Sequence, residues 1–95
     1  MTKKEKQYLS EVAGLGCIAC EKIGFFGTPA EIHHVRFNQG VAQRASHYDV
    51  LPLCPHHHRT GGYGEAFHAG QKIWQEKFGT EKDLLNEIKK RCKGK

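Results

Sequence analysis

The chain has 95 residues, of which 38% are hydrophobic, and a formal net charge of +5 at pH 7. This length predicts one small domain, and the basic charge suggests a polyanionic partner, with nucleic acid as the first candidate. No apolar run is long enough to span a membrane, and the N-terminal stretch MTKKEKQYLSEV lacks the apolar segment of a secretion signal. Composition therefore argues against a membrane or secreted protein and favours a cytosolic, reducing setting.

The N-terminal segment predicts a helix. Thr2 followed by Glu5 forms a capping box, and Gly14 with Gly16 ends the helical pattern. Apolar residues recur in between at helical spacing, namely Tyr8, Leu9, Val12 and Leu15. The segment CIAC (17–20) then predicts a tight turn, and 24–29 a loop.

Two short strands are predicted in the middle of the chain. The first covers 30–35, with Ile32 and Val35 as its apolar members, and the second covers 50–53. Pro52 indicates that the second strand is irregular or lies at an edge. The polar and basic residues 36–46 between them predict an exposed loop.

Helices are predicted again in the C-terminal half. One starts near Cys54 and Pro55, since proline is tolerated in a first helical turn, and glycines interrupt it. A second ends at Gly79, and Thr80 can cap a third. Both carry apolar stripes that we interpret as core: Ile73, Trp74 and Phe78, then Leu84, Leu85 and Ile88. The predicted fold class is α+β with little strand.

Two pairs of metal-ligating residues share one spacing. Cys17 and Cys20 form a C-x-x-C motif, and Cys54 with His57 repeats that spacing later in the chain. Two such pairs supply the four thiolate and imidazole ligands of a tetrahedral structural Zn²⁺ site. In a reducing setting the pattern favours metal over disulfides. A single C-x-x-C motif could be a redox pair, but the second pair favours zinc.

The run His56–His58 predicts a further site. Consecutive helical residues point about 100° apart, so His57 and His58 do not easily serve the same ion. Cys54 can share a helix face with either of them, and geometry alone does not choose. Pairing Cys54 with His57 keeps the repeated spacing and leaves His58 for a second site, with His56 interpreted as a surface residue.

The tandem pair His33–His34 closes the first predicted strand. Because strand neighbours alternate sides, one of the two can face His58 across a second metal ion while the other faces a substrate. Two strands carrying this pair, packed on a helix carrying a late histidine, form a ββα-metal arrangement.

These motifs resemble those of the HNH endonucleases: C-x-x-C, then a tandem HH, then L-C-x-x-[CH]-H. The segments LGCIAC, EIHHVR, ASHYDVLPLCPHHHRTGG and FHAG look closest to the phage- and prophage-borne recombination-enhancement, RecA-dependent nucleases. The resemblance implies a small zinc-stabilised ββα-metal (HNH) fold with flanking helices, as a single nuclease domain over 1–95. It also implies endonuclease activity.

The resemblance assigns roles to individual histidines. In this family the first residue of the tandem pair binds the catalytic metal and the second is the general base, which implies His33 as ligand and His34 as base. The late helix histidine, here His58, is the second ligand. His68 in FHAG can complete the site.

One position departs from the family pattern. The chain has Asp49 where the family has a middle asparagine, and His47 stands two residues earlier. Either residue could orient His34 through a hydrogen bond, and His47 could instead bind metal. The sequence leaves these alternatives open.

Phosphodiester hydrolysis requires an activated water and a cation for the charge that develops. A histidine suits the first task, and one divalent ion suits the second. Imidazole ligands favour Zn²⁺, Ni²⁺ or Mn²⁺, with Mg²⁺ accommodated through added waters. Four basic residues flank the proposed site as candidate DNA-phosphate contacts, with a solvated surface charge as the alternative for each: Arg36, Arg44, Arg59 and Lys72.

The sequence thus predicts a metal-dependent DNA endonuclease of low sequence specificity, acting in phage or prophage recombination in the cytoplasm of a bacterial host. DNA is the expected partner, and the resemblance adds a RecA-type recombinase filament. Two other classes compete with this prediction. A non-catalytic zinc module that binds nucleic acid explains the cysteines and the charge but not the histidines. A redox protein using Cys17 and Cys20 explains none of the histidines either.

Overall fold

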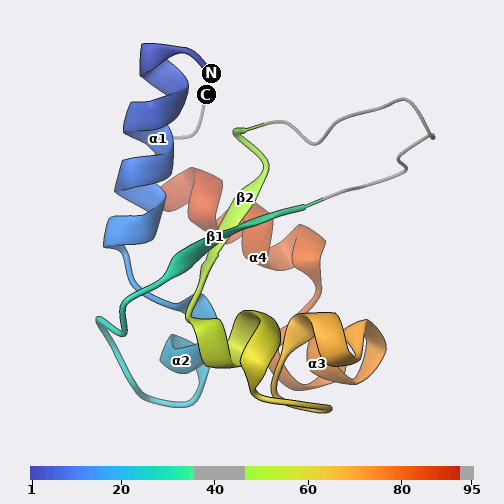
Figure 1. Ribbon diagram of the computed structural model, residues 1–95. Helices are drawn as coiled ribbons and strands as arrows, with labels where there is room; N and C mark the ends of the chain where they lie inside the picture. The colour runs from blue at the N-terminus through green and yellow to red at the C-terminus, as the bar shows by residue number, and fades with distance from the viewer. Residues whose placement is uncertain (36–46, 93–95) are drawn as a thin grey trace, which may run out of the picture.

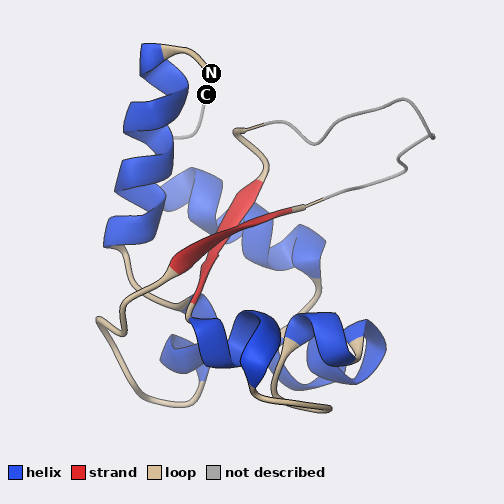
Figure 2. Cartoon of the chain, in the orientation of Figure 1, coloured by secondary structure: helices blue, strands red, loops and turns tan. Residues whose placement is uncertain are grey.

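The computed structural model describes residues 1–35 and 47–92 of the chain (Figure 1). Along these residues the elements are α1 (Lys3–Gly14), α2 (Ile18–Lys22), β1 (Glu31–His34), β2 (Val50–Leu53), the π-helical turn η1 (His56–Thr60), the 3-10 turn η2 (Phe67–Ala69), α3 (Gln71–Phe78) and α4 (Glu81–Arg91). The two strands cross at the centre and the helices lie around them (Figure 2). The predicted α+β class is confirmed.

Helix α1 begins at the predicted capping box. The Thr2 hydroxyl accepts the backbone N–H of Glu5 at 3.1 Å, and the Glu5 carboxylate accepts the backbone N–H of Thr2 at 2.7 Å. These bonds satisfy N–H groups that the start of a helix leaves unpaired. Tyr8 and Val12 are buried, so the apolar face predicted from the spacing is the face that packs on the sheet.

The two predicted strands pair antiparallel, with His33 opposite Leu51 and His34 opposite Val50. The first strand is one residue shorter at each end than predicted. Pro52 lies within β2, where it is tolerated because a two-stranded sheet consists of edge strands. All four residues of β2 are buried, whereas in β1 only His33 is. The sheet thus directs His33 into the molecule.

The prediction of a tight turn over CIAC is wrong. Cys17 is the N-cap of helix α2, and its Sγ accepts the backbone N–H of Cys20 at 3.4 Å. The cysteine side chain fills the place that serine or aspartate usually takes at a helix start. A turn and the first turn of a helix share this local geometry, so four residues of sequence do not separate them.

The helix predicted near Cys54 also differs in detail. Pro55 is the N-cap of η1, a π-helical turn in which the N–H of Gly61 bonds the carbonyl of His56 at 2.9 Å. Such wide turns are rare in proteins, and those that do occur are often found at functional sites.

The end of α3 and the start of α4 lie where the sequence predicts them. Gly79 ends α3 with a φ of 113°, in the left-handed region that glycine tolerates. The Thr80 hydroxyl accepts the N–H of Asp83 at 3.1 Å and caps α4. The predicted apolar stripes supply buried core residues: Trp74, Phe78, Leu84, Leu85 and Ile88.

Strand β2 lies at the centre of the core. Helices α1, α2 and α4 all contact it, and the buried residues of these elements join in one hydrophobic cluster. Arg91 of α4 also binds the carboxylate of Glu21 in α2 through contacts of 2.8 and 3.2 Å. Among the described residues, none of the helices has the length and apolar character needed to cross a membrane.

Candidate metal centres and active site

The first candidate metal centre is a cluster of three cysteines and one histidine. Cys17 and Cys20 lie at the start of α2, Cys54 follows β2, and His57 lies in η1. Nδ1 of His57 is 3.2 Å from Sγ of Cys54, 3.4 Å from Sγ of Cys20 and 3.8 Å from Sγ of Cys17. All four ligand atoms lie within 4.8 Å of one another. The fold thus brings together the four residues expected from the repeated spacing.

The chemistry of this Cys₃His cluster fits a metal ion. Its four residues are buried, and its cysteines are free thiols rather than disulfides. Burial raises the pKa of Cys17 to about 12, so a cation is needed to hold it as a thiolate. Burial lowers the pKa of His57, which keeps its imidazole neutral and able to bind metal. Three sulfurs and one imidazole nitrogen match the ligand set of tetrahedral zinc.

The second candidate centre is a cluster of three histidines. His33 comes from β1, His58 from η1 and His68 from η2. Nε2 of His58 lies 3.2 Å from Nδ1 of His33 and 3.0 Å from Nε2 of His68. His33 is buried and His68 is exposed, so this cluster opens to solvent on the His68 side.

Two of these histidines each have an outer ring nitrogen, the one that points away from the cluster, in contact with a carboxylate. Nε2 of His33 lies 2.7 Å from Oε2 of Glu81, and Nδ1 of His58 lies 2.6 Å from Oε2 of Glu31. Hydrogen bonds from Arg59 and then His58 lower the pKa of Glu31 to about 2. The other ring nitrogens of these two histidines, Nδ1 of His33 and Nε2 of His58, lie 3.2 Å apart and converge toward one point.

The third member of the cluster has a lowered pKa. Burial, followed by the charges of His58 and His33, lowers the pKa of His68 and so favours its neutral form. Three imidazoles, open on one side, suit a transition-metal ion that keeps free coordination positions.

Turn η1 sends consecutive histidines to different places. His57 joins the cysteines, His58 joins the histidine cluster, and His56 is exposed with its Nε2 3.3 Å from Glu65. His56 lies at the surface, as expected, whereas the binding of different ions by His57 and His58 stays a prediction.

His34 lies beside the histidine cluster. A cavity of about 120 Å³ is lined by His33, His34, Phe67, His68, Gln71 and Glu81. Nε2 of His34 is 3.2 Å from Nδ1 of His47, whereas the carboxylate of Asp49 pairs with Nζ of Lys89 at 2.8 Å. Of the two residues that the sequence left open, His47 is in hydrogen-bond contact with His34.

The four basic residues expected to contact DNA differ in their surroundings. Arg36 and Arg44 lie outside the described residues. Arg59 is exposed, but its guanidinium contacts the Glu31 carboxylate at 2.8 and 3.1 Å. A phosphate bound by Arg59 would therefore share the guanidinium with Glu31.

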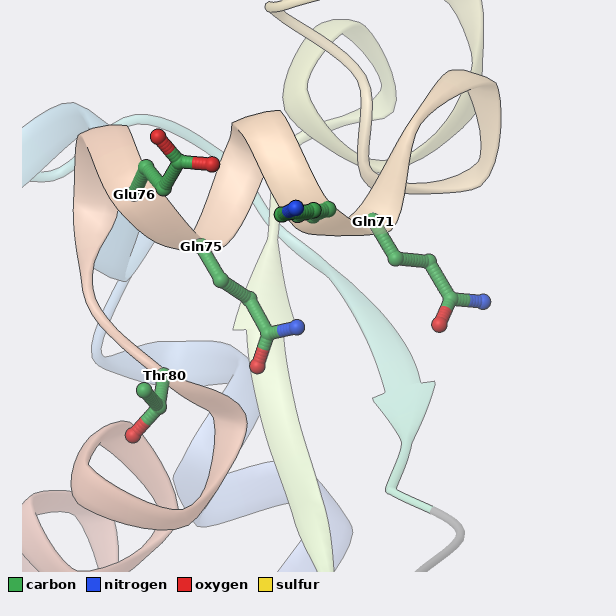
Figure 3. Close-up of a pocket in the computed structure, with 5 residues that line it drawn as sticks. Gln71, Gln75, Glu76 and Thr80 are labelled. Atoms are coloured by element: carbon green, nitrogen blue, oxygen red, sulfur yellow. The ribbon is translucent and has the colours of Figure 1, made fainter.

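Lys72 lies at an open hollow of about 630 Å³ on α3 (Figure 3). The hollow is also lined by Gln71, Gln75, Glu76 and Thr80. Gln71 lines both this hollow and the smaller cavity at His34. A contact of Lys72 with DNA phosphate stays a prediction.

Sequence reasoning missed Glu31 and Glu81. Glu31 precedes His33 by two residues on β1, and strand alternation places both on one side, so the strand pattern did hold a signal. Glu81 begins α4, 48 positions after His33. No spacing rule links residues that far apart, and only the packing of α4 brings Glu81 to the cluster.

A buried Cys₃His cluster beside an open three-histidine cluster defines a small α+β protein with two separate candidate metal centres among the described residues. A third group of possible ligands, His56, His57 and Glu65, shares His57 with the Cys₃His cluster. Residues 1–92 match the model of the family described as recombination enhancement, RecA-dependent nuclease, and the chain belongs to this family. The resemblance inferred from the sequence is confirmed at this level, and it assigns the chain to nucleases that act in recombination, with DNA as substrate. A comparison with curated proteins gave no match.

Proposed function

We propose that the protein is an HNH-type, metal-dependent DNA endonuclease with a ββα-metal core made of β1, β2 and η1. One observation carries the proposal: the candidate ligands His33 and His68 and the candidate base His34 line a single cavity. Hydrolysis requires a cation and a base within reach of one phosphate. Phosphate contacts carry no base information, so we expect nicking or cutting with low sequence specificity.

The histidine cluster is proposed as the catalytic metal site, with Nδ1 of His33 and Nε2 of His58 and His68 as ligand atoms. A divalent ion bound there supplies stabilisation for the charge that develops on the phosphate and the leaving oxygen. Imidazole ligands accept Zn²⁺, Ni²⁺ or Mn²⁺, and Mg²⁺ through added waters.

His34 is proposed as the general base that takes the proton of the attacking water. Its Nε2 lies 3.2 Å from Nδ1 of His47, a contact that would hold the imidazole in one orientation for this task. This contact favours His47 over Asp49 as the residue that orients the base. Asp49, paired with Lys89, instead links the start of β2 to α4.

The cluster of Cys17, Cys20, Cys54 and His57 is proposed as a structural Zn²⁺ site. Four protein ligands complete a tetrahedral shell, so no position is left for a substrate or a water. The three-histidine cluster has three protein ligands among residues 1–35 and 47–92, which leaves coordination positions for water or substrate, and it is the better candidate for chemistry.

DNA binding is proposed along the hollow on α3 and across the mouth of the histidine cluster. Lys72 at the hollow and Arg59 beside Glu31 would bind phosphates, and the net charge of +5 supports binding to a polyanion. Arg36 and Arg44 stay proposed phosphate contacts, since they stand between β1 and β2 in the sequence.

The proposed setting is phage or prophage recombination in the cytoplasm of a bacterial host. The family description supports a RecA-type recombinase filament as the partner that presents the DNA. We also propose that residues 1–95 form one HNH domain, because buried residues from all four α-helices join one hydrophobic cluster.

A non-catalytic zinc module that binds nucleic acid is the alternative. It would account for the Cys₃His cluster and the charge. It would not account for three histidine nitrogens that converge at 3.0 and 3.2 Å, nor for His34 on the same cavity. A redox role for Cys17 and Cys20 is weaker, since Cys54 and His57 pack against the same sulfurs.

The test is cleavage of supercoiled plasmid by the purified protein, with and without a RecA-type recombinase. Protein stripped with a chelator is compared with protein given back one divalent metal at a time. We expect two metal ions per chain by mass spectrometry, and metal-restored conversion of the plasmid to nicked or linear forms. One ion per chain with no conversion in any arm would favour the binding module. Cleavage that persists after complete metal removal would exclude the metal-dependent mechanism.

A further inference from the structure

Two acidic residues contact members of the histidine cluster and belong to different elements. Glu31 is on β1 and Glu81 is the first residue of α4. The side chains of Glu81 and His33 are 16% and 5% exposed, and those of Glu31 and His58 are 29% and 13% exposed. These contacts are therefore sheltered from solvent more than an ordinary surface ion pair.

We propose that Glu81 and Glu31 are positioning residues, which fix the ring orientation and tautomer of His33 and His58 so that both direct a lone pair at one metal ion. The inference rests on the proposed function and names residues that set the strength of its metal site. Carboxylates that accept the outer N–H of a metal-binding histidine raise its basicity and hold its ring in place.

The two histidines must adopt opposite tautomers. His33 donates from Nε2 to Glu81 and offers Nδ1, whereas His58 donates from Nδ1 to Glu31 and offers Nε2. The two offered nitrogens lie 3.2 Å apart. With both outer nitrogens protonated, these inner nitrogens both carry lone pairs, and a shared cation relieves their repulsion.

The carboxylates are themselves held in place. Arg59 binds both oxygens of Glu31, at 2.8 and 3.1 Å. The backbone N–H of Glu81 donates to Oε1 of Gln75 at 2.9 Å, and the cap at Thr80 fixes the start of α4. The first turn of a helix also favours a negatively charged side chain. Helix α4 therefore positions a residue of the site, in addition to packing on the core.

The test measures metal affinity at the histidine cluster. Co²⁺ is titrated into protein that already holds one equivalent of Zn²⁺, and binding is followed by visible absorption and by competition with a chelator. The variants are Glu81→Ala, which removes the acceptor, and Glu81→Gln, which keeps one acceptor oxygen. The matched control is Asp83→Asn, which removes an exposed carboxylate from the same first turn of α4.

We expect Glu81→Ala to weaken Co²⁺ binding by about 10- to 100-fold, the usual effect of losing such a partner. Glu81→Gln should fall between Glu81→Ala and the parent, and Glu31→Ala should behave like Glu81→Ala. Asp83→Asn should bind Co²⁺ like the parent, and circular dichroism should show the same fold in every variant.

Two results would overturn the inference, and they have different consequences for the proposed function. If the parent binds the second ion and Glu81→Ala binds it equally well, the positioning role is wrong while the proposed function stands. If the parent takes up no second ion at all, the proposed catalytic metal site fails, and the positioning role fails with it.

Discussion

His33 and His34 are neighbours on β1 and lie in different surroundings. His33 is 4% exposed and has one ring nitrogen toward His58 and the other on Glu81. His34 is partly buried and contacts His47. Successive strand residues leave opposite faces, and both can border one cavity because β1 is an edge strand. A fixed, desolvated side chain suits a metal ligand, and a more accessible one suits a base.

Substitution of the tandem pair separates the two roles. His34→Ala should leave folding and both metal ions in place, while plasmid cleavage falls by about 10²- to 10⁴-fold, the usual contribution of a positioned base. His33→Ala should lose the second ion, and cleavage should recover in part at raised metal concentration. Metal content by mass spectrometry and plasmid cleavage are measured side by side. Loss of an ion from His34→Ala, with both ions kept by His33→Ala, would reverse the assignment.

For individual residues, the sequence predicts the candidate metal ligands better than it predicts the residues that hold those ligands in place. The four members of the Cys₃His cluster followed from one spacing used twice, because a turn places residues i and i+3 on one side. The carboxylate of Glu81 could not be predicted, because its contact with His33 depends on how α4 packs. The contact of His34 with His47 joins residues 13 positions apart, and no spacing rule predicts it.

Turn η1 is the element that joins the two candidate centres. His57 and His58 are consecutive in it, and each belongs to a different cluster. The turn is closed by the bond from the N–H of Gly61 to the carbonyl of His56. A small shift of η1 would move a ligand of both centres at once.

Gly61→Ala tests this coupling. A Cβ at position 61 would lie 2.5 Å from the carbonyl oxygen of His56 and 2.8 Å from its ring, so the backbone of η1 must shift. We expect a loss of about 1–3 kcal/mol in the free energy of unfolding, as for other overpacked sites, and weaker binding of both ions. The measurements are thermal melting and metal content after gel filtration.

Gly14→Ala is the matched control, because a Cβ there meets nothing within 4 Å and alanine favours the end of α1. It should melt at or above the temperature of the parent. A Gly61→Ala protein that keeps both ions and melts at the same temperature as the parent would disprove coupling through η1.

Element boundaries were predictable where a cap marks them. Thr2, Gly79 and Thr80 each mark a helix boundary through a local rule, and the start of α1, the end of α3 and the start of α4 lie there. Helix α2 was mistaken for a turn because a cysteine is an unusual N-cap. The π-helical form of η1 was not predictable, since proline in a first turn is equally compatible with an ordinary α-helix.

Over the whole molecule, the metal clusters and the core share residues. Cys17, Cys20 and Cys54 belong to the hydrophobic cluster that joins α1, α2, the strands, α3 and α4. A chain of this length buries a modest apolar area, and such small domains commonly depend on a metal or on disulfides. The structure offers free cysteines and a Cys₃His cluster at the point where α2, β2 and η1 meet. Metal binding and folding should therefore be one event.

Cys20→Ser provides the test of that coupling, with Cys92→Ser as its matched control. Structural zinc contributes about 10–16 kcal/mol of apparent binding energy in zinc-finger peptides, while a whole domain is stable by only about 5–15 kcal/mol. Serine in place of the Cys20 thiolate should therefore largely unfold the protein, because the two energies are of the same size. Cys92 is a free, partly buried thiol at the end of α4, so the same substitution there should leave folding nearly unchanged. Far-UV circular dichroism and thermal melting, with and without added Zn²⁺, measure both variants. A Cys20→Ser protein with parental helicity and a cooperative melt would show that the core alone holds the fold, and the structural role of the Cys₃His cluster would have to be abandoned.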